Sequence, residues 1–489
     1  MPTQTPAASS LALLTDLYQL TMAYGYWKSG TAEQESVFHL FFRRHPFKGG
    51  FTVTCGQQPA LDYLEAFRFE SADVDYLATL TGNDGASLFE DGFLRHLSDL
   101  RLEIEVDAMA EGTVAFPHEP ILRVRGPLLQ CQLLETPLLN IVNFQTLIAT
   151  KAARICMATG GEPVLEFGLR RAQGVDGALA ASRAAYVGGC AATSNVLAGR
   201  LHGIPVKGTH AHSWVMSFES EREAFETYAS AMPNNCVFLV DTYDTLEGVR
   251  QAIEVGRELR ARGHEMVGIR LDSGDLAWLS IEARKLLDAA GFEQASIVAS
   301  NDLDEHLIRS LKQQDAKIGV WGVGTKLATA YDQPALGGVY KLAALREPGG
   351  DWRYTVKLSE QAIKISNPGL QQVVRFREGE RFVGDALYNE AQPPGDGALT
   401  MIDPADATRQ KRFEATVTRR PLLQPALRGG ARVAEPESLE EVRERVQQEL
   451  AGFHRGIKRF DNPHSYPVGL EQGLFELKDR LVRRARRLS

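Results

Sequence analysis

The middle of the chain repeats a pattern of short apolar runs, each followed by a polar or glycine-containing turn. Several runs are separated by segments with apolar residues every three to four positions, which is the spacing of an amphipathic helix. The clearest helices are expected over 246–259 and 281–290. Alternating strands and helices predict a parallel sheet, and runs that are apolar throughout indicate strands buried on both faces. The six runs are 164–167, 204–206, 237–240, 266–269, 296–299 and 318–321.

Six such strands favour an α/β fold with a central TIM-like β/α barrel, and an open doubly wound sheet is the second choice. The flanking segments differ, because 34–60 and 101–125 alternate between apolar and polar residues and 351–386 holds short strand-like pieces. We therefore expect a split, mostly antiparallel α+β domain built from both sides of the barrel. The expected segments are an N-terminal α+β domain (1–150), the barrel (151–345) and a C-terminal segment (346–489) that completes the α+β layer and adds terminal helices.

Composition narrows the class of protein. The 489 residues are 44% hydrophobic and 24% charged, with a net charge of -8, which is typical of a soluble globular protein and argues against a general nucleic-acid binder. Five scattered cysteines predict reduced thiols in a cytoplasmic protein. No apolar run reaches membrane-spanning length, and the polar segment 1–10 has no signal-peptide pattern. The basic C-terminus, with Leu474, Leu477, Leu481 and Leu488 near helical spacing, favours a docked final helix over a membrane or RNA tail.

Polar side chains gather where the predicted strands end. Functional groups of a β/α barrel lie at the carboxyl ends of its strands, so the pattern gives a set of candidate site residues. Arginines suit carboxylate or phosphate oxygens, and carboxylates suit magnesium, ribose hydroxyls or a developing positive charge. We expect a ligand with a phosphate, a ribose and a separate anionic group. The candidates are Arg170, Arg171, Thr209, His212, Asp241, Asp244, Arg270, Asp272, Asp275, Ser300, Asn301, Gly322, Gly324 and Thr325.

Several candidates have a structural alternative. Asp244 has the spacing of a helix N-cap. The turn at 322–325 could cradle a phosphate, although glycine is common in barrel turns generally. Arg171 could be a surface or salt-bridging residue. His210 and His212 would share one face of a strand as a metal pair, but spacing supplies no third ligand.

Six segments resemble the motifs of the nicotinate phosphoribosyltransferase family, a type II phosphoribosyltransferase family. Their combined order and spacing is highly specific, and the resemblance runs from about residue 11 to 376. Beyond residue 400 no motif is found. The segments are LLTDLYQLTM at 13–22, FFRRHPFKGG at 41–50, EFGLRRAQG at 166–174, GTHAHS at 208–213, RLDSGD at 270–275 and GVGTKL at 322–327.

The resemblance implies a seven-stranded irregular, incomplete barrel with a split α/β domain, in a homodimer whose active sites lie at the subunit boundary. It implies that Tyr18 reaches the nicotinate ring bound by the other subunit, opposite Phe167. Thr209 and Arg270 would contact the nicotinate, and Arg170 would lie close to the ring or the pyrophosphate. The remaining substrate contacts are expected at Ser300, Asn301, Gly324 and Thr325.

The resemblance also implies the reaction. Nicotinate and phosphoribosyl pyrophosphate would give nicotinate mononucleotide and pyrophosphate, the first step of NAD synthesis from nicotinate. ATP hydrolysis would be coupled through phosphorylation of His212 rather than His210, which stands where the family often has an apolar residue. Asp241 and Asp272 would act beside the ribose and a magnesium ion held mainly by the pyrophosphate.

Three alternatives stay open at this point. A nicotinamide-specific phosphoribosyltransferase shares most of these motifs. A barrel lyase or aldolase acting on a phosphorylated substrate would need a lysine or a metal at a strand end, and only Lys207 and Lys326 are placed for that role. A non-catalytic nucleotide-binding protein would lack one of the charged strand ends, all of which are present here.

Overall fold

The structure is a computed structural model that describes residues 11–487. Two predictions fall outside that range. One is the absence of a signal peptide in segment 1–10, and the other is the place of Leu488 in the final helix. The chain divides into two compact units. Unit 1 consists of Met1–Thr146, Ala335–Ser438 and Gln447–Ser489, and unit 2 consists of Leu147–Pro334 and Leu439–Val446.

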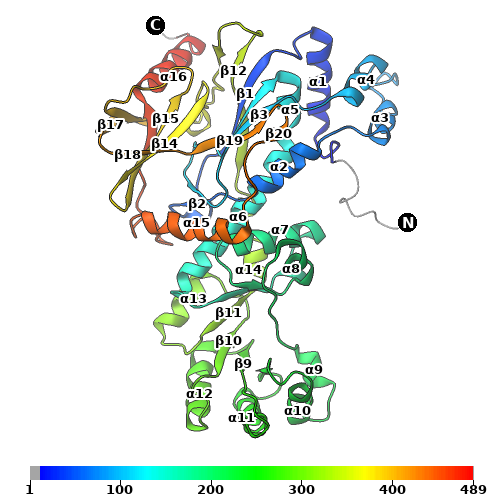
Figure 1. Ribbon diagram of the computed structural model, residues 1–489, viewed down its shortest axis with the longest axis vertical. Helices are drawn as coiled ribbons and strands as arrows, with labels where there is room; N and C mark the ends of the chain where they lie inside the picture. Colours follow the sequence, from blue (N-terminus) through cyan, green and yellow to red (C-terminus); the bar gives the residue numbers. More distant parts are fainter. Residues whose placement is uncertain (1–10, 488–489) are drawn as a thin grey trace. The chain divides into compact units, whose positions relative to one another are not determined.

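The strands of unit 2 form one parallel sheet in the order β7-β6-β11-β10-β9-β8. Five of the six predicted runs are confirmed as strands of this sheet. The two predicted helices are confirmed as α11 (Thr245–Ala261) and α12 (Leu276–Ala289), green in Figure 1 beside β9 and β10. The strands are β6 (Val164–Glu166), β7 (Ala192–Thr193), β8 (Val237–Leu239), β9 (Gly268–Leu271), β10 (Ser296–Ala299) and β11 (Val320–Val323).

The predicted strand at 204–206 is wrong in its extent. Val206 forms only an isolated parallel bridge with Thr193. Pro205 has no N–H with which to extend a ladder towards a further strand, and Val206 is 45% exposed. Within residues 11–487 no pairing joins β7 to β8, so the sheet has two edges and the structure contains no closed barrel.

Helices follow most strands of unit 2, and several begin after a residue whose side chain caps the helix N-terminus. Asp244 accepts a hydrogen bond from the Glu247 N–H and caps α11, and Asp275 accepts one from the Trp278 N–H and caps α12. Both carboxylates satisfy amides that the first helical turn leaves unpaired. The other helices are η3 (Leu169–Arg171), α7 (Gly174–Val187), α8 (Val196–His202), α9 (His212–Met216), α10 (Glu221–Ala231), α13 (Glu305–Gln313) and α14 (Thr325–Ala328).

Unit 1 contains two larger sheets and a small two-stranded one. The seven-stranded sheet is antiparallel throughout, in the order β13-β12-β1-β5-β3-β19-β20. Its interior strand β1 is buried at seven of eight positions, so the alternation expected over 34–60 is wrong for this strand, which is covered on both faces. The strands are β1 (Glu35–Phe42), β3 (Glu105–Met109), β5 (Leu122–Pro127), β12 (Gly338–Arg346), β13 (Arg353–Tyr354), β19 (Leu423–Arg428) and β20 (Ala431–Arg432), with β2 (Thr52–Val53) and β4 (Val114–Ala115) in the small sheet.

The six-stranded sheet of unit 1 has the order β17-β16-β21-β15-β14-β18, and only β15 and β21 pair in parallel. Phe376 and Phe413 stack across it with their ring centres 3.8 Å apart. Fully buried Arg375 binds both carboxylate oxygens of Asp385 and also Glu449, which neutralises a charge that would otherwise be costly to bury. The strands are β14 (Gln371–Glu378), β15 (Arg381–Asn389), β16 (Leu399–Asp403), β17 (Asp406–Phe413), β18 (Thr418–Pro421) and β21 (Val468–Glu471).

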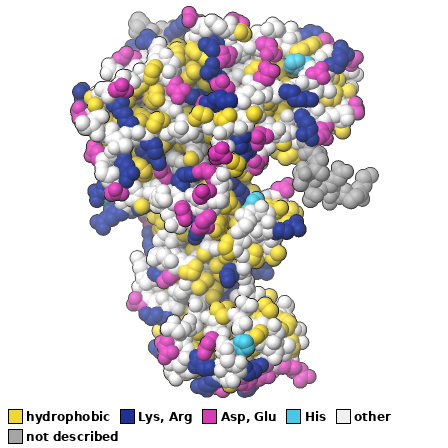
Figure 2. All heavy atoms as spheres, viewed as in Figure 1, with side chains coloured by type: hydrophobic (Ala, Val, Ile, Leu, Met, Phe, Trp, Pro, Cys, Tyr) yellow, Lys and Arg dark blue, Asp and Glu magenta, His cyan; other side chains and the backbone are white. Residues whose placement is uncertain are grey.

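The final helix α16 (Gln472–Ala485) is confirmed as a docked helix, because Leu474 and Leu477 are buried. Among residues 11–487, none of the helices combines the length and apolar character that crossing a membrane requires. Figure 2 shows basic and acidic side chains interspersed over the visible face. The remaining helices are α1 (Leu17–Ser29), η2 (Pro46–Lys48), α2 (Gln57–Ala66), α3 (Ser71–Ala78), α4 (Asp91–Asp99), α5 (Leu128–Leu133), α6 (Glu135–Thr159), η4 (Ala362–Lys364) and α15 (Leu439–Gly452).

Candidate active site

An arginine at the end of β9 is the centre of a polar network in unit 2. Arg270 donates to the Thr209 hydroxyl at 2.8 Å, to the Ser300 hydroxyl at 3.0 Å and to Asp272 at 3.0 Å. Its side chain is only 15% exposed. Side chains after β9, after β10 and in the loop that contains Thr209 thus hold one guanidinium in a fixed orientation, which preorganises it for an anionic group.

Asp272 is held as a carboxylate within this network. It accepts a short hydrogen bond from the Ser300 hydroxyl as well as the bond from Arg270. Burial opposes ionisation, but the hydrogen bond from Ser300 and the charge of Arg270 outweigh it and keep the pKa of Asp272 below its ordinary value. The site therefore presents a negative charge directly beside its arginine.

A second carboxylate at the end of β8 faces the same region. Asp241 Oδ2 accepts from the backbone N–H of Asp272 at 2.8 Å and from the Ser273 hydroxyl at 2.6 Å. The Asp241 side chain is 1% exposed, and its Oδ1 atom has no hydrogen-bond partner among the described residues. A buried carboxylate oxygen without a donor is costly, so this atom marks a place that suits a cation or a ligand hydroxyl.

His212 begins α9 beside the two carboxylates. Its Nε2 atom lies 3.7 Å from Asp272 Oδ2 and 4.0 Å from Asp241 Oδ1, and its Nδ1 atom lies 3.1 Å from the Thr242 hydroxyl. The side chain is 39% exposed. The carboxylates favour the tautomer with the proton on Nε2, which leaves the lone pair on Nδ1.

The neighbouring His210 has a structural position. It is 8% exposed, and its Nε2 atom accepts a hydrogen bond from the backbone N–H of Leu239 in β8 at 3.2 Å. Its ring lies 5.0 Å from that of Tyr228. Burial lowers the pKa of His210 to about 4, so the ring is neutral near pH 7. His210 and His212 therefore point to different partners.

The ends of β6 and β11 meet through glycines. A Cβ atom on Gly322 would lie 2.8 Å from the Phe167 ring, and one on Gly324 would lie 3.1 Å from the Phe167 carbonyl oxygen. Because both residues lack a side chain, Phe167 packs closely against β11 and the turn that follows it. Thr325 begins α14 directly after Gly324.

The remaining predicted residues have other surroundings. Arg170 and Arg171 are exposed in η3, and Asn301 is exposed with φ 95°. Lys326 forms an ion pair with Asp304 at 2.7 Å. Tyr18, 48% exposed in α1, belongs to unit 1.

Sequence reasoning missed three polar side chains that hold the site. Thr242 contacts His212, and Ser273 contacts Asp241. Buried Glu166 at the end of β6 accepts from Ser182 and Thr193 at 2.9 and 2.6 Å. Thr242 directly follows the candidate Asp241, and Ser273 directly follows the candidate Asp272. Their position just after a strand was the signal that could have found them. Glu166 lies within the apolar run 164–167 and begins the motif at 166–174, and this position in a buried strand was the signal that could have found it.

The donors present fit magnesium only with help from a ligand. Asp241 and Asp272 offer carboxylate oxygens, which are the donors that magnesium prefers. Among residues 11–487, however, no group of three or more His, Cys, Asp or Glu side chains is arranged to hold a metal ion. A magnesium ion here would need phosphate oxygens and water to complete its coordination.

Comparison with known proteins shows the family of the chain. Residues 13–143, 163–348 and 370–478 match the N-terminal domain, the main family domain and the C-terminal domain of nicotinate phosphoribosyltransferase. The chain is 45% identical over 474 residues to the nicotinate phosphoribosyltransferase of Bacillus subtilis, covering 96% of this chain and 94% of that protein. It is 37% identical to the enzyme of Bos taurus, covering 98% of each.

Solved structures extend the comparison to the fold. Human nicotinic acid phosphoribosyltransferase superposes with a TM-score of 0.84 at 35% identity, covering 96% of this chain and 99% of that one. A nicotinate-nucleotide pyrophosphorylase from Pyrococcus furiosus shares the fold, with a TM-score of 0.70 at 21% identity and coverage of 92% and 97%. The mixed α/β fold and its matches define an enzyme of the phosphoribosyltransferase class. Within that class, the chain belongs to the nicotinate phosphoribosyltransferase family.

Proposed function

We propose that the strand ends of unit 2 bind nicotinate and phosphoribosyl pyrophosphate, and that the enzyme couples their reaction to hydrolysis of ATP. The observation that carries this proposal is Arg270, which is held by Thr209, Ser300 and Asp272 beside the buried carboxylate of Asp241. Such a group combines an anion-binding guanidinium with carboxylates suited to a ribose and a developing cation.

Arg270 would bind the carboxylate of nicotinate and so select the acid over the amide. The ion pair with Asp272 offsets part of the charge of Arg270 and also fixes the orientation of its guanidinium. A ligand carboxylate would therefore meet an arginine that is already positioned to bind it. Thr209 would complete the contact, and Phe167 would lie against the pyridine ring, while Arg170 would lie near the ring or pyrophosphate. A neutral amide would leave the arrangement with less favourable charge pairing.

In the reaction, the pyridine nitrogen forms a bond to the anomeric carbon while the bond from that carbon to pyrophosphate breaks. The nitrogen carries no proton to remove, so positioning and electrostatics supply the catalysis. The transition state is cationic at the ribose ring, where Asp241 and Asp272 provide negative charge. Ser300, Asn301, Gly324 and Thr325 would hold the phosphoribosyl group.

Magnesium fits this proposal as an ion bound chiefly by pyrophosphate. The Asp241 Oδ1 atom without a hydrogen-bond partner is the protein oxygen most suited to it, and Asp272 is the second. When bound, the ion would stabilise negative charge on the leaving pyrophosphate.

ATP would phosphorylate His212 at Nδ1. The two carboxylates hold the proton at Nε2, and the Thr242 hydroxyl beside Nδ1 would be displaced by the incoming phosphoryl group. The imidazole nitrogen bonds to the γ-phosphorus as the bond to ADP breaks, and water later cleaves the phosphorus–nitrogen bond. That hydrolysis would drive the overall reaction towards nicotinate mononucleotide.

The wider arrangement of the protein follows the same proposal. A homodimer would share its active sites, with Tyr18 of each subunit serving the other. The parallel sheet would curve as an irregular, incomplete barrel, since His210 bonds to β8 from the segment whose Val206 bridges to β7. All five cysteines are reduced thiols, on which we base the proposed cytoplasmic location.

Measurement of nicotinate mononucleotide formed from nicotinate and phosphoribosyl pyrophosphate, with and without ATP and magnesium, tests this proposal. The unaltered enzyme should form product and should be stimulated by ATP. Arg270→Ala should lose most activity, whereas Arg250→Ala, on the exposed face of α11 in the same unit, should retain it. Equal loss in both variants, or a preference for nicotinamide, would contradict the assignment.

A further inference from the structure

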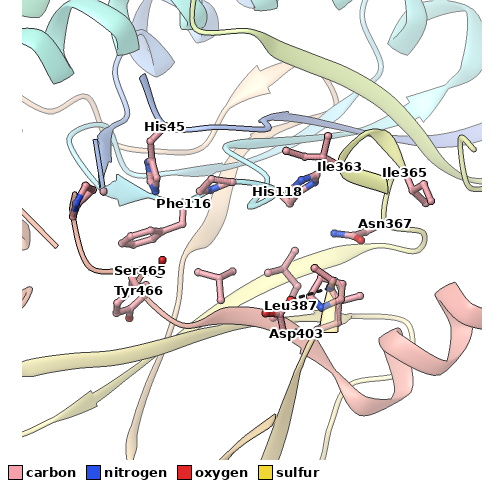
Figure 3. Close-up of a pocket in the computed structure, with 18 of the residues that line it drawn as sticks. His45, Phe116, His118, Ile363, Ile365, Asn367, Leu387, Asp403, Ser465 and Tyr466 are labelled. Atoms are coloured by element: carbon pink, nitrogen blue, oxygen red, sulfur yellow. Dashed lines mark hydrogen bonds between the residues drawn. The ribbon is translucent and has the colours of Figure 1, made fainter. Parts of the chain in front are cut away.

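Unit 1 contains a cavity that the proposed reaction does not use. It has a volume of about 590 Å³, within the range typical of small-molecule sites. Its lining comes from the η2 turn, the 116–118 segment, the 363–367 loop, β15, β16, β21 and α16. Figure 3 shows His118 and Ile363 on one side of the cavity, facing Leu387 and Asp403 on the other.

The walls of this cavity are rigid and mostly apolar. Phe116 stacks on Tyr466 with ring centres 4.3 Å apart, and the Tyr466 hydroxyl donates to buried Asp385 at 2.8 Å. Asp385 is in turn fixed by Arg375, so this wall is continuous with the buried ion cluster of the six-stranded sheet. Ile365 and Leu387 are also buried parts of the lining. A preformed apolar wall suits a ligand with an apolar body.

One cation in the wall has no anionic partner. The Lys478 ammonium on α16 donates to the amide oxygen of Asn367 at 2.8 Å, and within residues 11–487 no carboxylate lies within ion-pair distance of it. Burial lowers the pKa of Lys478 to about 8. Lys326, which is also partly buried, pairs with Asp304, whereas the Lys478 ammonium has no such acid and so can take the anionic group of a ligand.

The other polar groups of the wall do not neutralise Lys478. The one carboxylate in the lining, Asp403, accepts from the Ala405 N–H and lies 3.6 Å from Arg409. Burial lowers the pKa of His118 to about 4, aided by Lys478, so its ring is neutral near pH 7. Burial likewise lowers the pKa of His45 to about 3, and that ring bonds to Thr52. His464 is a further polar group of the lining.

We propose that this cavity is a second ligand site, which takes a small organic anion with an apolar ring and one carboxylate or phosphate group. The anionic group would lie against the Lys478 ammonium, and the neutral ring of His118 could donate a further hydrogen bond. The apolar body would lie between the Phe116 and Leu387 walls. This site does not depend on the reaction proposed for unit 2, because all of its lining belongs to unit 1.

Calorimetric titration of the full chain with 1-naphthoate, 1-naphthyl phosphate and the neutral 1-naphthamide tests the proposal. We expect at least one anion to bind, and the amide to bind at least about tenfold more weakly. Lys478→Met keeps the apolar stem and should weaken anion binding by at least about tenfold. Lys458→Met is the matched control, since Lys458 is also partly buried and donates only to a backbone carbonyl, but lies outside the cavity. That variant should bind as the unaltered protein does.

Two further measurements keep the test independent of folding and of the other site. On the unaltered protein, naphthoate affinity should fall about tenfold from pH 7 to pH 9, as the Lys478 ammonium loses its proton. Arg270→Ala should leave the affinity unchanged. Unaltered binding in Lys478→Met, equal binding of the amide, loss of binding in Arg270→Ala, or no binding of either anion at about 10 mM would each overturn the proposal.

Discussion

His210 and Leu239 are joined by a 3.2 Å hydrogen bond in which the histidine Nε2 atom accepts the backbone N–H of the edge strand β8. The bond uses the lone pair that a phosphoryl acceptor would need. Because the same histidine follows the Val206 bridge to β7, its side chain links the two edges of the parallel sheet where a backbone ladder is missing. The two histidines lie two residues apart in the sequence but contact different partners.

We predict that His210→Ala lowers the free energy of unfolding by about 1–3 kcal/mol at pH 7, since it leaves the Leu239 N–H unpaired. The folded-state pKa of His210 lies near 4, below that of a free histidine, so its contribution is present above about pH 6.5 and is lost as pH falls towards 4. Chemical denaturation at pH 7 and pH 4 measures this. A variant as stable as the unaltered enzyme at pH 7 would contradict the structural role.

Arg270→Lys should reduce kcat/KM for nicotinate by about 10²–10³-fold, although it keeps the positive charge. A lysine cannot make the bonds to Thr209, Ser300 and Asp272 in the same fixed geometry, and loss of such a buried contact costs about 2–5 kcal/mol. Competition between nicotinate and nicotinamide gives the selectivity directly. The unaltered enzyme should prefer the acid, and equal efficiency with the amide would remove the role assigned to Arg270.

We predict that ionisation of Glu221 lowers the free energy of unfolding as the pH rises from about 4.5 to about 7. The residue is 9% exposed, one of its carboxylate oxygens lacks a hydrogen-bond partner among the described residues, and burial, aided by Asp241, raises the pKa of Glu221 to about 7. A raised carboxyl pKa means that the folded protein holds this proton more tightly, so stability falls as pH rises through that window.

Glu221→Gln should therefore be more stable than the unaltered enzyme at pH 8 by about 1–2 kcal/mol, and closely similar to it at pH 4.5. Thermal unfolding at the two pH values measures the difference. Glu226→Gln, an exposed position on the same helix, is the control. If Glu221→Gln changes the stability equally at both pH values, the titration is not that of Glu221.

Tyr18 should complete the active site of the other subunit. Tyr18 is 48% exposed in α1, and an exposed aromatic side chain can stack on a pyridine ring. We expect Tyr18→Ala and Arg270→Ala proteins to be inactive separately and to recover about a quarter of the full activity when mixed, because random exchange gives half the dimers one intact site. Absence of recovery, with exchange shown independently, would mean that each site is built from one chain.

The parallel strands and the helices between them could be predicted because each is a continuous apolar run or a long helical repeat. The strand predicted at 204–206 was wrong in its extent. Its side chains are apolar like those of a strand, but Pro205 has no N–H to donate to a neighbouring strand. Strand β7 has only two residues, which is too short for any periodic signal. Strand β17 is exposed at almost every position, so no alternation marked it.

The strand-end rule correctly predicted that Arg270, Asp272 and Asp241 lie together, because parallel strands bring their carboxyl ends to one edge of the sheet. His212 joins these candidate residues from the segment after the Val206 bridge, not from a strand of the sheet. The same rule included Asp244 and Asp275, whose side chains cap helices. A carboxylate after a strand serves either purpose, and only the hydrogen bonds of the folded chain distinguish the two. The cavity with Lys478 had no sequence signal, since its lining comes from segments up to hundreds of residues apart.

Labelling with γ-³²P-ATP and magnesium, followed by acid and alkali treatment, tests most directly whether His212 couples ATP to synthesis. The label should be lost in acid and survive alkali, should vanish in His212→Ala, and should persist in the folded fraction of His210→Ala. His212→Ala should also keep some synthesis of nicotinate mononucleotide but lose its stimulation by ATP. Label retained in His212→Ala, or undiminished stimulation by ATP in that variant, would show that His212 does not couple ATP to synthesis.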